Sequence, residues 1–214
     1  GGKTSPQGMA NTLRQFDNKV SAPLKRKYPA VVVHDGWLTP TIKKTLTNAA
    51  GLSTVLFQYV NTSDTVWMGQ HPEKYQILDC KYHGRSYRDM NRVFIRLMFE
   101  ASFIRQFDYW MRLDLDITID NPIKVDPFRV MHSGDYDFGY VQCLRGWGCN
   151  AGLSQFLTSY AAGMNVSDPP FLHDVTSRGV YFYGNVGIGR VAMFTSPQYL
   201  RFAQFMDENG GILR

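Results

Sequence analysis

The sequence predicts an α/β domain with a mostly parallel central sheet flanked by helices. Two observations indicate this class. Short apolar runs that suit buried strands alternate with segments of helical periodicity. Four helix starts combine a capping residue with a following proline, which is favoured at the first helical position. Strands that alternate with helices usually form parallel sheets covered on both faces.

Length and composition support one globular unit. The 214 residues are enough for a substantial core, so we expect residues 1–214 to form a single domain. Hydrophobic residues make up 44% and charged residues 19%, which excludes a disordered chain. The net charge of +5 favours anionic ligands such as nucleotide diphosphates. The positive residues form no long run, so we expect no nucleic-acid partner.

The first part of the chain predicts two helices and two strands. One helix begins at Ser5-Pro6, and a buried strand follows over residues 29–34. A second helix runs from Thr39-Pro40 to about Asn48, and residues 54–60 form the next strand. Residues 61–84 are polar, aromatic and irregular, which predicts a long loop of the kind that is often functional.

The second part continues the alternation. A long helix starts at Ser86 and leads to a strand that begins at Tyr109. We then expect a helix from Asp126-Pro127, a strand over 137–142 and a flexible rim over 143–150. A helix over 150–164 and a loop over 165–179 follow. The chain ends with strands over 181–186 and 190–194 and a last helix from Ser196-Pro197 to Gly210.

Two aspartates, Asp114 and Asp116, end the apolar run that begins at Tyr109. In an extended chain, residues two apart point to the same side, so both carboxylates can face one ligand. Open α/β sheets bind ligands at the carboxyl ends of their strands. Mg²⁺ and Mn²⁺ prefer carboxylate and phosphate oxygens. The pattern predicts a metal site that would neutralise the diphosphate of a nucleotide-sugar; the alternative is a strand end with two solvated aspartates.

The segments around this pair resemble one enzyme family. Ser86–Phe94 precedes the pair, Tyr109–Arg112 leads into it and Asp126–Met131 follows it. Tyr183–Ile188 and Asp207–Gly211 come later. In this order the segments resemble the fungal-type α-1,2-mannosyltransferases, the glycolipid 2-α-mannosyltransferase family (glycosyltransferase family 15). The resemblance extends over nearly the whole chain.

The resemblance implies a fold, a reaction and a set of site residues. The fold is a nucleotide-sugar-binding GT-A-type fold, and the reaction is transfer of mannose from GDP-mannose to a mannoside acceptor with retention, in protein or lipid glycosylation. It implies a Mn²⁺ cofactor held by Asp114 and Asp116. Tyr87, Arg92 and Asp116 would bind the donor, and Tyr87 and Asn185 would act in catalysis. The implied partners are the nucleotide-sugar donor and a glycan acceptor.

The chain departs from the family at three positions. Asp114 stands where the family has a glutamate, and Leu115 replaces a proline. Gly187 stands where the family has the glutamate proposed as the nucleophile. Retention by two displacements needs a carboxylate beneath the anomeric carbon. The chain would therefore use front-side attack with the leaving phosphate as base, use another carboxylate, or be inactive.

Other parts of the family pattern would lie before Gly1 and after Arg214. We therefore expect a catalytic domain that is truncated at both ends. The full-length form would be a type II membrane protein of the Golgi lumen, anchored outside this chain. Two alternatives stay open: a non-catalytic sugar-binding relative of the same fold, which Gly187 favours, and a glycosyltransferase with a different donor such as UDP-galactose.

Overall fold

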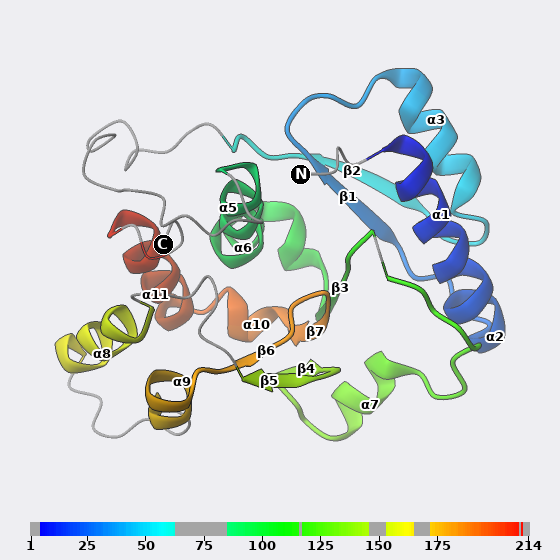
Figure 1. Cartoon of the computed structure of the whole chain (residues 1–214). Helices are drawn as coiled ribbons and strands as arrows, with labels where there is room; N and C mark the ends of the chain where they lie inside the picture. The colour runs from blue at the N-terminus through cyan, green and yellow to red at the C-terminus, as the bar shows by residue number, and fades with distance from the viewer. Residues whose placement is uncertain are drawn as a thin grey trace.

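The computed structural model describes residues 5–62, 85–115, 117–145, 153–164, 172–209 and 211. Within them, helices surround three small sheets (Figure 1). The predicted α/β class is confirmed. None of the described helices combines the length and apolar composition that a bilayer crossing requires.

The N-terminal part forms a β-α-β unit with a preceding helix. Its elements are α1 (Pro6–Phe16), the π-helical turn η1 (Asp17–Ser21), α2 (Ala22–Leu24), β1 (Ala30–His34), α3 (Pro40–Ala49) and β2 (Val55–Tyr59). Strands β1 and β2 are parallel, with Ala30 opposite Val55. The helical run ends where Lys25 adopts a left-handed conformation with φ of 52°.

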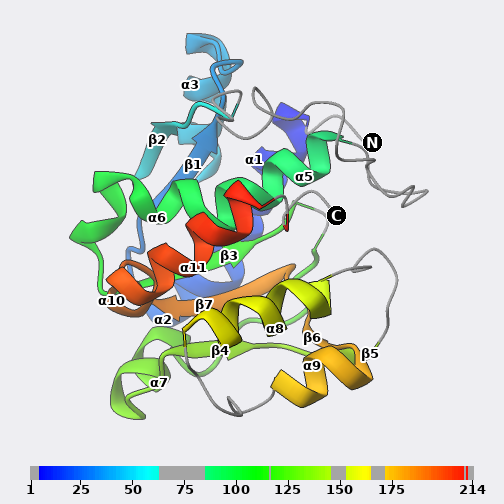
Figure 2. The ribbon, with the colours of Figure 1, turned by 90° about the vertical axis from the view of Figure 1, so that its left-hand side faces the viewer.

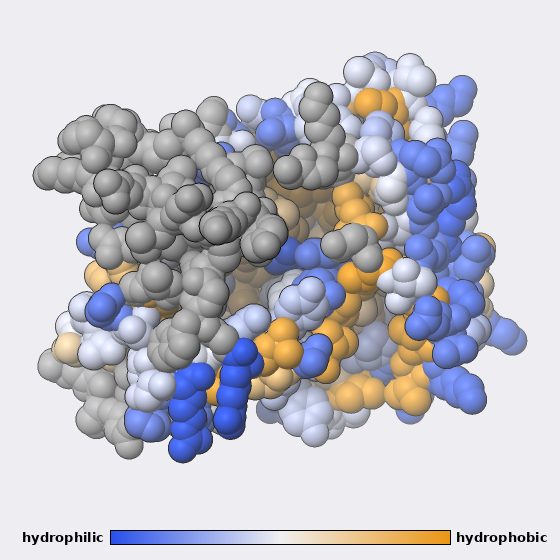
Figure 3. Space-filling view, in the orientation of Figure 1, coloured by the Kyte–Doolittle hydropathy of each residue, from blue (hydrophilic) through white to orange (hydrophobic). Residues whose placement is uncertain are grey.

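Helices α1 and α3 pack on the parallel pair and form a first core. Their apolar side chains meet strand residues in a cluster of Met9, Ala10, Val32, Leu38, Leu46 and Ala49. The predicted caps explain where both helices begin, because Ser5 accepts from the Gly8 amide at 3.0 Å and Thr39 from the Ile42 amide at 3.3 Å. The outer sides are hydrophilic, as the blue edge along α1 and α2 in Figure 3 shows.

A long helical stretch then crosses the molecule and leads into β3. It consists of α5 (Arg85–Arg92), the π-helical turn η2 (Val93–Leu97), α6 (Met98–Glu100) and the 3₁₀ turn η3 (Ser102–Gln106). The helix predicted from Ser86 is thus confirmed, but it breaks at Ala101, which has an extended ψ of 136°. The turned view places α11 (Pro197–Glu208) alongside this stretch (Figure 2).

The remaining strands are antiparallel. Strand β7 (Val186–Arg190) lies between β3 (Tyr109–Leu113) and β4 (Phe138–Tyr140), and β5 (Cys143–Arg145) pairs with β6 (Val180–Phe182). Among the described strands, the prediction of mostly parallel pairing therefore holds only for β1 and β2. The order of strands and helices does not fix strand direction, and here the β6–β7 segment runs back along β4–β5.

Several helices of the second part were predicted correctly and two were not. Helices α7 (Pro127–Ser133), α8 (Leu153–Gly163) and α11 confirm the prediction. Helix α9 (Leu172–Arg178) lies in a predicted loop, and α10 (Val191–Phe194) lies in a predicted strand. Strand β5 occupies part of the predicted flexible rim. A four-residue apolar run such as Val191–Phe194 has no periodicity that separates strand from helix.

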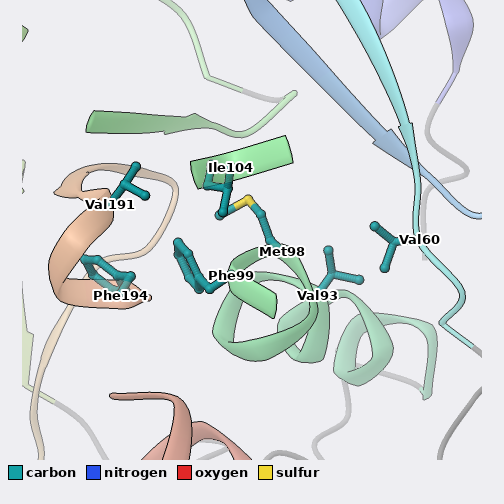
Figure 4. Packing of buried hydrophobic residues seen from close by; sticks show 7 residues of the cluster. All are labelled: Val60, Val93, Met98, Phe99, Ile104, Val191 and Phe194. Atoms are coloured by element: carbon teal, nitrogen blue, oxygen red, sulfur yellow. The ribbon is translucent and has the colours of Figure 1, made fainter. Parts of the chain in front are cut away.

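A second core joins the helical stretch to the antiparallel sheet. It contains Val60, Val93, Met98, Phe99, Ile104, Val191 and Phe194 (Figure 4). Phe99 is fully buried, and its ring stacks on Phe194 with centroids 4.8 Å apart. Such aromatic pairs add to the hydrophobic burial. This core fixes β3 and β7, and with them the end of β3 where the acidic residues lie.

Candidate functional site

The predicted acidic residue Asp114 follows β3 and forms an ion pair with Arg112. The Arg112 Nε donates to Asp114 Oδ1 at 2.7 Å, and Nη2 donates to Oδ2 at 3.1 Å. The guanidinium also lies 3.9 Å from the centroid of the Phe94 ring. The side chains are 15% and 28% exposed, so the charges are held in place yet reachable from solvent. The contact uses Nε and Nη2, so Arg112 is held in a fixed orientation and becomes a binding group for an anion when a cation takes over the Asp114 carboxylate.

Asn185 lies opposite Asp114, directly after the last pair of the β3–β7 ladder, and next to a bulge in the β6–β7 segment. Tyr140 lies opposite Gly187, and Cys143 lies opposite Phe182, so two residues on one side face four on the other. Bulges often occur next to active sites. The Asp114 amide donates to the Asn185 carbonyl at 3.0 Å, which extends the β3–β7 ladder by one residue.

The side chain of Asn185 has an unmet hydrogen bond. Its Oδ1 is buried and has no hydrogen-bond partner among the described residues. Buried polar atoms are almost always paired, and an unpaired one indicates a place for a ligand or water. The backbones of Asp114 and Asn185 are therefore adjacent, and the Asn185 amide oxygen can accept from a hydroxyl; that the two residues share a site stays a prediction.

Gly187 lies in the centre of the antiparallel sheet, opposite Arg112 on one side and Tyr140 on the other. A Cβ at this position would lie 3.6 Å from the Phe138 ring, an ordinary contact. Within β3, β4 and β7, the face shared by Arg112, Gly187 and Tyr140 carries no carboxylate; Asp114 follows directly after β3.

The predicted metal site has one described carboxylate. Asp114 is partly exposed, and a divalent ion bound through one carboxylate and the phosphates of a substrate is a common arrangement. The described residues contain no group of three or more His, Cys, Asp or Glu side chains around a common point. Asp114 therefore fits a metal shared with a diphosphate, provided that Arg112 releases one of its oxygens. Asp116 lies outside the described residues.

The other predicted site residues lie on the helical stretch. Tyr87 belongs to α5, but its side chain lies outside the described part. Arg92 is buried, and its Nε donates to both oxygens of Asp207, at 2.8 and 2.7 Å. In this structure its guanidinium pairs with α11 and also donates to the Thr62 carbonyl at 3.4 Å. Its predicted contact with the donor stays a prediction, as does that of Tyr87.

Two residues of the cluster, Arg112 and Phe94, are not among the predicted site residues. The sequence does contain a signal for Arg112, because Arg112 and Asp114 carry opposite charges and residues two apart in a strand lie on the same side. Phe94 shows no such signal, since its contact with Arg112 joins the helical stretch to β3 and depends on the tertiary fold.

The carboxyl ends of the parallel strands carry His34 and Tyr59, with ring centroids 6.1 Å apart. Burial lowers the pKa of His34, Lys43 lowers it further, and Asp35 opposes the shift. The His34 Nδ1 accepts from the Gly36 amide at 3.1 Å. A neutral imidazole is thus favoured at the edge where open α/β sheets bind ligands.

Comparison with known sequences identifies one family. The family profile described as glycolipid 2-alpha-mannosyltransferase matches residues 6–147. Glycolipid 2-alpha-mannosyltransferase 1 of Candida albicans is 25% identical over 140 residues, which cover 60% of this chain and 32% of that protein. Glycolipid 2-alpha-mannosyltransferase of Saccharomyces cerevisiae is 22% identical over 96% of this chain and 50% of its own length. The chain thus spans between about a third and a half of these relatives.

Solved structures of mannosyltransferases share the fold. Core-mannan synthase A of Aspergillus fumigatus, in its Mn/GDP form, superposes with a TM-score of 0.77 at 16% identity, covering 97% of this chain and 62% of that one. Ktr4p of S. cerevisiae in complex with GDP superposes with a TM-score of 0.73 at 15% identity, over 98% and 60%. These similarities confirm the predicted α/β glycosyltransferase fold. Since the family profile covers more than half of the sequence, the chain belongs to the glycolipid 2-alpha-mannosyltransferase family.

Proposed function

We propose that this chain is part of a retaining α-1,2-mannosyltransferase that transfers mannose from GDP-mannose to a mannoside acceptor. We further propose that it acts in protein or lipid glycosylation in the Golgi lumen, anchored through a segment outside this chain. Family membership supports the transferase class, and the relatives' names support the sugar and the linkage. The titles of the similar structures name Mn and GDP, which supports the donor and the cofactor.

The observation that carries the proposal is the cluster of Arg112, Asp114 and Asn185 at the end of β3. Arg112 supplies a fixed positive charge for a phosphate oxygen of the donor. Asp114 would hold Mn²⁺, which when bound would neutralise the diphosphate as it leaves. The Asn185 amide oxygen accepts a sugar hydroxyl and so orients the ring. Charges arranged in advance where the leaving group develops charge are a major source of catalysis.

Gly187 bears on how retention would be achieved. Double displacement needs a carboxylate below the sugar, and the strands around Gly187 carry none on that face. We therefore favour front-side attack, with the leaving phosphate as the base for the acceptor hydroxyl. In this mechanism Arg112 holds the phosphate and Asn185 holds the sugar, and no protein nucleophile takes part.

The test is calorimetric titration of the chain with GDP in the presence of Mn²⁺. We expect Asp114→Asn to weaken binding at least about tenfold, since a charged contact is lost. Asp120→Asn is the matched control, because it removes an exposed carboxylate from the following segment and should change nothing. Binding by Asp114→Asn that equals the wild type would overturn the site assignment. Thermal-shift titration with GDP-mannose and UDP-galactose then decides the donor.

A second candidate function is a non-catalytic sugar-binding relative of the same fold. The absent carboxylate at Gly187 favours it. A transfer assay on the full-length protein, with GDP-mannose, Mn²⁺ and a mannoside, separates the two. Turnover supports the enzyme, and donor binding without turnover supports the non-catalytic relative.

A further inference from the structure

Three aromatic rings are packed together between β4, the edge strand of the β3-β7-β4 sheet, and β6 of the β5-β6 pair. The ring centroids of Tyr140 and Phe182 are 4.1 Å apart, with 31° between the ring planes. Phe138 lies 5.8 Å from Phe182 and also contacts Phe194 of the core at 5.9 Å. We call Phe138, Tyr140 and Phe182 the aromatic platform. Phe138 thus anchors the aromatic platform in the hydrophobic core, which keeps the rings in place.

The outer end of the aromatic platform faces solvent. Tyr140 is 49% exposed and Phe182 is 46% exposed, although the two rings contact each other. Single exposed apolar residues are common, but adjacent ones that form a patch mark binding surfaces. The hydroxyl of Tyr140 adds a polar group at the edge of the patch. The rings are tilted against one another, so the aromatic platform offers the exposed ring surface of Tyr140 and Phe182, with the Tyr140 hydroxyl as a polar group at its rim.

The aromatic platform adjoins the candidate site. Tyr140 is opposite Gly187, and Gly187 is opposite Arg112, so all three share one face of the sheet. With neighbouring strands about 4.8 Å apart, Arg112 and Tyr140 are separated by about 10 Å, roughly the span of two linked sugar rings. Gly187 itself places no side chain between them, and the ring of Phe138, a member of the aromatic platform, lies against this position. A ligand bound at Arg112 and one bound on the aromatic platform would therefore be neighbours.

We propose that the aromatic platform binds a pyranose ring of the glycan acceptor, with Tyr140 as the stacking surface. This rests on the proposed function, and it assigns the acceptor side of the same site. A hexopyranose has a face of C–H groups, which packs on an aromatic ring, and a rim of hydroxyls. The Tyr140 hydroxyl, at the exposed end of the ring, offers a partner for that rim.

The position also argues against the nucleotide base as the occupant. The diphosphate is expected at Arg112 and Asp114. The nucleoside then extends toward the carboxyl ends of the parallel strands β1 and β2, where open α/β sheets bind ligands. The aromatic platform lies outside the parallel pair, on β4 of the β3-β7-β4 sheet and on β6 of the β5-β6 pair. The aromatic platform therefore lies on the side where we expect the sugar of the donor, and the acceptor must approach from that side.

The test is saturation-transfer NMR of the chain with methyl α-mannoside and with α-1,2-mannobiose, in the absence of donor. We expect transfer to the C–H protons of one ring face. Tyr140→Leu keeps apolar volume but removes the flat ring, and should weaken mannoside binding by about five- to tenfold, the scale of one aromatic contact. Phe182→Leu should act in the same direction. Tyr136→Leu is the control, since Tyr136 is 55% exposed and lies outside the aromatic platform.

The same samples are titrated with GDP and Mn²⁺, which tests the donor site separately. Weakened mannoside binding with unchanged GDP binding in Tyr140→Leu supports the proposal. It is overturned if the wild type shows no transfer to either mannoside, or if Tyr140→Leu and Tyr136→Leu bind it equally. It is also overturned if Tyr140→Leu loses GDP binding but keeps mannoside binding. Failure of the wild type to bind GDP counts against the donor site and leaves the acceptor result interpretable.

Discussion

Arg92 and Asp207 form a buried ion pair that joins α5 to α11. The Arg92 Nε lies 2.8 and 2.7 Å from the two carboxylate oxygens, and both side chains are 5% exposed. The Arg96 Nη1 donates to the same carboxylate at 2.9 Å. A buried ion pair adds little net stability over an apolar contact, but removing one partner leaves an uncompensated charge.

Asp207→Ala should therefore lower the free energy of unfolding by about 3–5 kcal/mol. Chemical denaturation at neutral pH measures the change. Glu100→Ala is the control, because Glu100 pairs with Arg96 at 39% exposure, and exposed pairs contribute less than about 1 kcal/mol. Equal losses in the two variants would show that the buried pair is not what joins the two helices.

Gly189 and Gly187 should differ in their tolerance of a methyl group, although both lie in β7. A Cβ at Gly189 would lie 2.5 Å from the Phe194 ring and 2.7 Å from the Trp110 Nε1, inside the core. We expect Gly189→Ala to destabilise the chain by about 1–3 kcal/mol, the usual cost of overpacking. Gly187→Ala meets only ordinary contacts and should cost less than about 1 kcal/mol. Thermal or urea unfolding of the two variants compares them directly, and the reverse order would contradict the packing described.

His34 should make stability depend on pH. Its folded-state pKa is lowered, first by burial, below the ordinary value of 6.5. The unfolded chain therefore takes up the proton first as the pH falls, and stability is lost from about pH 6.5 down to the folded pKa. The wild type should lose more stability than His34→Gln between about pH 7.5 and pH 5. Urea midpoints at each pH measure this, and parallel curves would exclude His34 as the source.

Arg112→Lys should weaken binding of GDP with Mn²⁺ by about tenfold. A lysine ammonium can neither make the bidentate contact that Arg112 makes with Asp114 nor stack on the Phe94 ring in the same way. Calorimetric titration measures the dissociation constant. Arg190→Lys is the control at the other end of the same sheet, where Arg190 pairs with Asp135 and Asp137. If both variants bind GDP alike, Arg112 is not a donor-binding group.

Much of the local structure could be predicted from short-range signals. Ser5, Thr39, Asp126 and Ser196 all cap helices at the expected residue, because capping depends only on the next three residues. Strand direction was predicted less well. It depends on long-range pairing, and the sequence around Val186 does not reveal that β7 would lie between β3 and β4.

The site was predictable where its residues are close in sequence. Asp114 ends an apolar strand, and this pattern alone placed it at a sheet edge. The approach of Asn185 to Asp114 depends on the antiparallel register of β3 and β7, which joins residues far apart in sequence. The contact of Arg112 with Phe94 depends on how the helical stretch crosses β3. Such contacts come from the tertiary fold and leave no periodic signal.

The bulge in the β6–β7 segment, beside Asn185, also bears on which insertions and deletions the chain can accept. Residues 183–185 join β6 to β7, so the loss of one residue there keeps β7 in register only if this connection takes up the change. If β7 instead shifts by one position, the two faces of the strand are exchanged. Val186 and Ile188 would then point where the two glycines now leave room for aromatic rings.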